Sequence, residues 1–173
     1  MIAAVTQTLT EILVENSSLI RNVEIDLNHP QTRQDVRPAL SLYLYELTKS
    51  NYNERGDRDY PSNTEHYIVD WYDLSFVIIP WDWTVLGQWQ LLSEVLKSLL
   101  PYQLIVQDKL APELRGFGDL PLKIATSIPS TAKWSKVRGG FFPPALYITI
   151  KTPFVVTKPS LSPKSRFFKT ENG

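Results

Sequence analysis

The stretch YDLSFVIIPWDW, from Tyr72 to Trp83, holds an apolar run and itself ends on two tryptophans, Trp81 and Trp83. The run is at most about ten residues long and lies between Asp73 and Asp82, whereas a helix that crosses a bilayer needs about 20 apolar residues. It therefore does not predict a membrane span. A short run rich in Phe, Val and Ile that stops at Pro80 is typical of a strand buried on both faces. We expect a central strand with something covering each side.

The composition limits the classes of protein to which the chain can belong. Its 173 residues are enough for one domain with a sizeable core. Lys plus Arg and Asp plus Glu both number 18, so no net charge favours a nucleic-acid partner. Cysteine is absent, which excludes disulfides, thiolate metal sites and a cysteine nucleophile. With no signal peptide in the first residues, we expect a cytoplasmic location.

The segments around the central strand predict an α+β domain. An amphipathic helix of about four turns begins at Ile2. A second helix follows Thr84, a plausible N-cap, and ends at Pro101. We expect it to cover the sheet with Val85, Leu86, Trp89, Leu92, Leu96, Leu99 and Leu100. Strands are expected over 23–27, 39–47, 67–79, 120–128 and 144–154, with a short helix over 130–137.

This order of elements fits a single mixed, mainly antiparallel sheet covered by helices. We assign residues 1–155 to this domain. Residues 156–173 are rich in Pro, Ser and basic residues and are expected to form a C-terminal tail.

Signals for catalysis are weak. The two histidines, His29 and His66, fall in expected loops, and no spacing suits a metal site, so we expect no metal and no cofactor. An enzyme that uses Asp73 or Asp82 beside the tryptophans remains an alternative, although two aspartates that flank a buried strand are typical strand-end residues.

Two polar segments are candidates for partner binding. The long loop between the strands at 39–47 and 67–79 is a solvated, charge-paired loop or a docking loop that uses Arg55, Asp57, Arg58 and Asp59. The tail is either a frayed terminus or an anchor. The anchor would comprise Lys158, Lys164, Arg166, Phe167 and Phe168.

Several stretches, taken in order, resemble one family. They are MIAAVTQTLTEIL, RPALSLYLYEL with its following loop, YDLSFVIIPW, LLSEVLKSLLPYQLI, LPLKIATSI and WSKVRGGFFPPALYITIKTPF, together covering about residues 2 to 155. The chain thus resembles the cap proteins, or tail terminators, of phage-tail-like contractile injection systems.

This resemblance implies a tail-terminator-like fold and a structural, non-enzymatic role. Such proteins form a homo-hexameric ring that stacks on the last sheath and inner-tube rings of an assembled particle, ends polymerisation and holds the sheath extended. No nucleic acid, cofactor or direct membrane span follows. Another tail-assembly part, such as a neck or tail-completion adaptor, remains an alternative.

Overall fold

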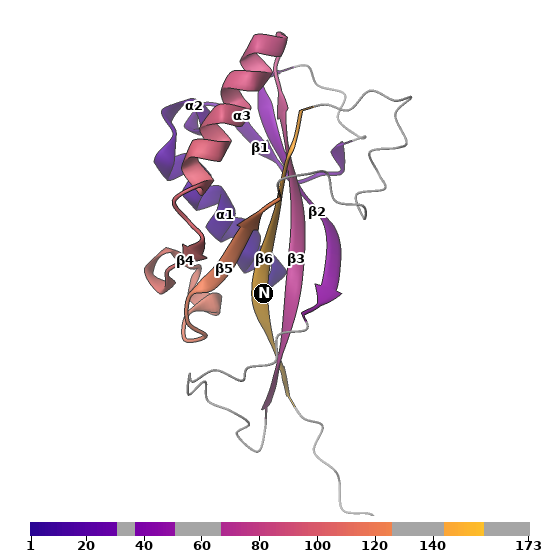
Figure 1. Cartoon of the computed structure of the whole chain (residues 1–173), viewed down its shortest axis with the longest axis vertical. Helices are drawn as coiled ribbons and strands as arrows, with labels where there is room; N and C mark the ends of the chain where they lie inside the picture. The colour runs from indigo at the N-terminus through magenta and orange to yellow at the C-terminus, as the bar shows by residue number, and fades with distance from the viewer. Residues whose placement is uncertain (31–36, 51–66, 126–143, 158–173) are drawn as a thin grey trace, which may run out of the picture.

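The computed structural model describes residues 1–30, 37–50, 67–125 and 144–157 (Figure 1). Its elements are, in order, α1 (Ile2–Asn16), α2 (Ser18–Arg21), β1 (Glu24–Asp26), β2 (Ala39–Lys49), β3 (Tyr67–Trp81), α3 (Val85–Leu99), β4 (Leu104–Ile105), two 3-10 turns (Gln107–Lys109 and Pro112–Leu114), β5 (Leu120–Ile124) and β6 (Leu146–Thr157). The helix expected over 130–137 lies outside the described residues.

The strands form one sheet in the order β1-β2-β3-β6-β5-β4. Among the described strands, only β1 and β2 pair in parallel, and the other neighbours are antiparallel. The mixed, mainly antiparallel α+β fold is confirmed, and so is the interior position of the strand that contains the opening run. The last strand continues two residues past the expected domain boundary, since Val156 and Thr157 still pair with Ile68 and Tyr67.

One face of the sheet carries the main core. Figure 1 shows α1 and α3 together on this side of the sheet. Leu74, Phe76 and Ile78 of β3 are fully buried there with residues of both helices, such as Leu9 and Val95. Alternate side chains of a strand point to opposite faces, so these three residues share the helical side.

The other face of the sheet has a smaller core. Val77, Ile79 and Tyr147 are buried together, and Tyr43, Tyr45, Trp81 and Ala145 pack against them. The rings of Tyr45 and Tyr147 meet edge to face, with centroids 5.9 Å apart. The opening run is therefore buried on both faces as expected, with helices on one side and aromatic side chains on the other.

The central strand does not stop at its proline. Pro80 lies inside β3, paired with Leu40, and the strand ends at Trp81. Successive residues of an antiparallel strand direct their backbone groups to alternate neighbours. The carbonyl of Trp71 accepts from the N–H of Ser50, so the odd-numbered residues of β3 direct their backbone groups toward β2. The even-numbered Pro80 therefore directs its backbone toward β6. On that side the described residues give β3 no partner beyond Ile78. No ladder hydrogen bond is lost, so the proline is tolerated.

Candidate functional site

Helix α3 buries a different face from the one that its apolar spacing suggested. The core receives Leu91, Val95, Ser98 and Leu99. Of the seven residues expected to cover the sheet, only Leu99 is fully buried, and Val85, Leu86, Trp89 and Leu100 are exposed. The expectation is therefore wrong for most of that stripe. At 3.6 residues per turn, Trp89 and Val95 lie about 120° apart around the helix, and the sheet contacts the side that carries Val95.

The start of α3 is held by a cap that reaches back to Asp82. The Asp82 carboxylate accepts hydrogen bonds from the backbone N–H and the hydroxyl of Thr84, both at 2.9 Å. The Thr84 hydroxyl oxygen accepts in turn from the N–H of Gly87, also at 2.9 Å. The N-cap predicted at Thr84 is confirmed, and it fixes the direction in which α3 leaves the sheet.

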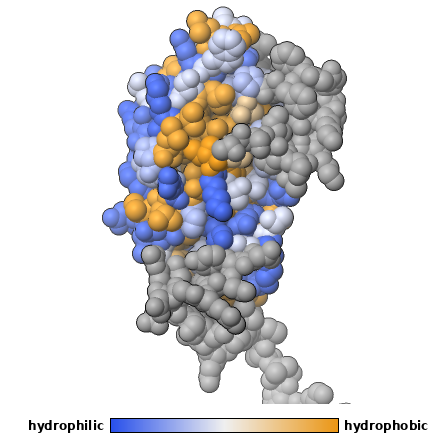
Figure 2. All heavy atoms as spheres, viewed as in Figure 1, coloured by the Kyte–Doolittle hydropathy of each residue, from blue (hydrophilic) through white to orange (hydrophobic). Residues whose placement is uncertain are grey.

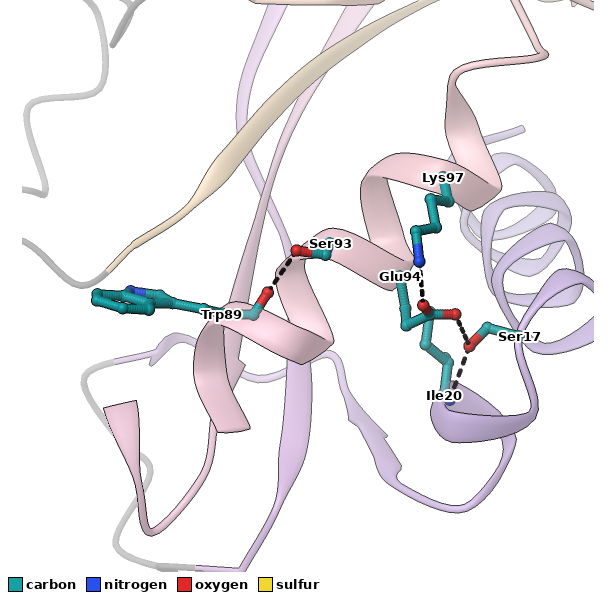
Figure 3. A network of polar contacts seen from close by, with 6 residues as sticks. All are labelled: Ser17, Ile20, Trp89, Ser93, Glu94 and Lys97. Carbon is teal, nitrogen blue, oxygen red and sulfur yellow. Dashed lines mark hydrogen bonds and ion pairs between the residues drawn. The ribbon is translucent and has the colours of Figure 1, made fainter. Parts of the chain in front are cut away.

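A second polar contact fixes the rotation of α3 about its axis (Figure 3). The Ser17 hydroxyl donates to Glu94 at 3.0 Å, and the Lys97 ammonium donates to the same carboxylate at 2.9 Å. These two hydrogen bonds, that from Lys97 first, hold the pKa of Glu94 below its ordinary value of 4.5. In Figure 3, Trp89 points to the opposite side of the helix from Ser17.

The result is an apolar surface at the start of α3. We call it the α3 surface and define it as Trp83, Val85, Leu86 and Trp89, with exposed fractions of 70%, 58%, 63% and 57%. Figure 2 shows apolar residues gathered on the face that α3 crosses. Clustered exposed apolar side chains on a protein surface mark interaction sites, and tryptophan is prominent among residues that dominate binding energies.

Two pockets flank α3, each of about 490 Å³. The first, here called the α2–α3 pocket, is lined by Leu19, Asn22, Val23, Glu24, Arg37, Pro38, Asp82, Trp83, Gly87, Gln90 and Leu91. The second, the β5 pocket, is lined by Leu99, Leu100, Tyr102, Gln103, Pro121, Leu122, Lys123 and Ile124. Trp83 belongs both to the α3 surface and to the first pocket, so the two features are continuous.

Sequence reasoning did not single out the α3 surface or the pockets. A signal existed, because α3 has more apolar residues than one buried face can hold. The predicted partner-binding residues Arg55, Asp57, Arg58, Asp59, Lys158, Lys164, Arg166, Phe167 and Phe168 lie outside the described residues. So does His66, whereas the ring of His29 packs edge to face on that of Tyr43, with centroids 4.8 Å apart.

The two candidate catalytic aspartates do not form a pair. Asp73 lies within β3, opposite Thr48 and Lys151, and Asp82 accepts from Thr84, the N-cap of α3. Nine residue-to-residue steps of extended chain separate them, about 30 Å at the rise of a strand. In the part of the chain that the structure describes, no group of three or more His, Cys, Asp or Glu could hold a metal ion. None of the described helices is long and apolar enough to cross a membrane.

Comparisons with known proteins agree on one group. A family model described as the Pvc16 N-terminal domain matches residues 4–164. The structure is similar to a PVC sheath/tube terminator from an extracellular contractile injection system in its extended state, with a TM-score of 0.65 and 14% identity over 100% of this chain and 64% of that one. It is also similar to the tube-terminating cap of the anti-feeding prophage, with a TM-score of 0.63 and 16% identity over 90% of this chain and 55% of that one.

The chain therefore spans less than two thirds of the length of either solved structure. At these identities the likeness establishes a common fold. No curated protein matches the chain in sequence.

Proposed function

Because the chain belongs to the Pvc16 N-terminal domain family, we propose that it is a structural terminator that closes the end of the sheathed tube of a contractile injection system. The observation that carries the proposal is the family match over residues 4–164. Fold likeness over the whole chain to a sheath/tube terminator supports the same role. The role needs no cofactor and no catalytic group.

The proposed cap acts as a hexameric ring of identical copies. Neighbouring copies in such a ring meet through two different surfaces, one on each side of the subunit. The α3 surface supplies one side of this contact in the proposal. It suits that role because contacts between copies of one chain are more apolar than the average protein surface, and Trp83 and Trp89 provide large side chains that can be covered.

The proposed partners beyond the ring are the sheath and the inner tube. The loop with Arg55, Asp57, Arg58 and Asp59 remains our candidate for docking onto them through complementary charge. Since these residues lie outside the described part of the chain, this assignment rests on their sequence alone.

The proposal is tested by assembling sheath and tube proteins with and without the full chain. Electron micrographs should show extended particles of uniform length when the chain is present. Without it, the sheathed tubes should vary in length or be contracted already. Light scattering on the isolated chain should give the mass of a hexamer at the concentrations used for assembly. A chain that stays monomeric and leaves the particles unchanged would contradict the proposal.

A further inference from the structure

The α2–α3 pocket has an apolar lining beside a tryptophan, which suits apolar side chains of a partner. Leu19, Val23 and Leu91 provide apolar lining, and Leu91 is buried at its base. Trp83 stands at the edge of the pocket with 70% of its surface exposed. A volume of about 490 Å³ lies within the range of pockets that bind ligands of several rings.

The charges around the two pockets differ in sign. Among the described residues, the charged side chains that line the α2–α3 pocket are the acids Glu24 and Asp82 and the base Arg37. In the β5 pocket the charged lining residue is Lys123. A basic segment is therefore favoured at the first pocket and disfavoured at the second.

The chain itself contains a segment of that chemistry. Residues 158–173 carry four basic residues and one acid, Glu171, around the adjacent pair Phe167 and Phe168. Arg166 and Lys169 flank the pair and could stack on the face of an indole, the preferred aromatic partner of a cation. We propose that Phe167 and Phe168 of one copy insert into the α2–α3 pocket of a second copy, with the flanking bases against Trp83.

The length of the chain favours a pocket on another copy. Strand β6 ends at Thr157, which pairs with Tyr67 at the start of β3, and β3 leads at its far end into Asp82 and Trp83 (Figure 1). The 14 steps from Tyr67 to Trp81 span about 46 Å at the rise of a strand. The ten residues from Thr157 to Phe167 reach about 36 Å at most. Even a fully extended tail would leave the Cα of Phe167 about 10 Å short of Trp81 in its own copy, so the pocket of a neighbouring copy is favoured.

This inference rests on the proposed association of copies, and it adds the contact that links each copy to the next. Trp83 joins the pocket to the α3 surface, so one neighbour can cover both. A tail that crosses between subunits makes ring closure depend on residues 158–173 without requiring them for the fold.

The absence of native cysteine allows a direct test by cross-linking full-length chains. One chain carries Gln90→Cys at the edge of the α2–α3 pocket, and a second, differently tagged chain carries Thr170→Cys, which preserves both phenylalanines. Oxidation of the mixture should give a covalent heterodimer. Adding Phe167→Ala and Phe168→Ala to the second chain should lower its yield about tenfold or more, because two anchoring side chains are removed. The matched control pairs Thr170→Cys with Leu100→Cys, which lies in the β5 pocket and is also exposed.

Three results would overturn the inference: no heterodimer, equal cross-linking to Leu100→Cys, or an intramolecular cross-link in a chain that carries both Gln90→Cys and Thr170→Cys. Light scattering and the particle assay on the same preparations test the tail contact and the proposed terminator role separately. Capping without the cross-link would refute the tail contact alone, and a specific cross-link without capping would refute the terminator role alone.

Discussion

The hydroxyl of Ser17 donates a hydrogen bond to the carboxylate of Glu94, 3.0 Å away, and so ties the junction of α1 and α2 to the middle of α3. The same hydroxyl oxygen accepts from the N–H of Ile20 at 3.3 Å, which makes Ser17 the N-cap of α2. One buried side chain thus serves two elements.

Replacing this serine should destabilise the fold. Ser17→Ala removes a cap and leaves one oxygen of Glu94 without its protein donor, and we expect a loss of about 1–2 kcal/mol in the free energy of unfolding. Urea denaturation followed by circular dichroism measures the change. The neighbouring Ser18→Ala is the matched control, because Ser18 is exposed, and it should change stability by less than about 0.5 kcal/mol. Equal effects of the two changes would show that the contact contributes little.

The pKa of Glu94 predicts a dependence of stability on pH. The hydrogen bond from Lys97, followed by that from Ser17, lowers this pKa in the folded chain, while burial opposes the shift. A depressed carboxyl pKa stabilises the fold fully above the unfolded-state value near 4.5 and loses that stabilisation as pH falls through the folded value. The stability advantage of the parent over Glu94→Gln should therefore shrink as pH falls from about 6 to about 3. Thermal unfolding of both proteins at each pH measures this advantage. A difference in unfolding temperature between parent and variant that stays constant over this range would contradict the assignment.

The two faces of β3 predict two core substitutions of different size. Phe76 is buried under the helices and Val77 on the aromatic side. Phe76→Ala should cost about 3–5 kcal/mol because a whole phenyl ring is lost, and Val77→Ala should cost about 2 kcal/mol because it removes fewer buried carbon atoms. Chemical denaturation measures both. Cooperative unfolding that survives Asp at either position would refute burial on both faces.

The features that the sequence predicts correctly are those that depend on residues close together along the chain. The cap at Thr84 follows from an oxygen placed three residues before a free N–H, and the burial of β3 follows from apolar residues at successive positions. The buried face of α3 was mistaken because the helix has two apolar faces, and tertiary contacts such as Ser17 with Glu94 decide between them. The α2–α3 pocket combines residues of α2, β1 and α3, which spacing along the chain does not bring together.

The α3 surface predicts a separation between folding and assembly. Leu86→Glu combined with Trp89→Glu should leave the domain folded and lower the free energy of unfolding by about 1–2 kcal/mol, since more than half of each side chain is already in water. The same variant should lose the hexamer, because two carboxylates would be buried without partners in the contact between copies. Thermal unfolding and light scattering give the two readouts. The control Ala3→Glu adds a charge at an exposed position of α1 and should change neither the unfolding temperature nor the hexamer. If the double variant still forms hexamers, α3 does not belong to the contact between copies.

Gly87 gives a prediction that opposes helix propensity. A side chain there would overlap the Asp82 carboxylate, which Thr84 holds by two hydrogen bonds. Alanine is favoured over glycine in a helix by about 1 kcal/mol, but displacing Asp82 forfeits two bonds worth about 2 kcal/mol together. Gly87→Ala should therefore destabilise by about 1 kcal/mol net. In the background of Asp82→Ala the overlap is gone, and the same substitution should become neutral or stabilising. A double-mutant cycle by urea denaturation decides the matter, because additive effects would mean that the two residues do not compete for the same space.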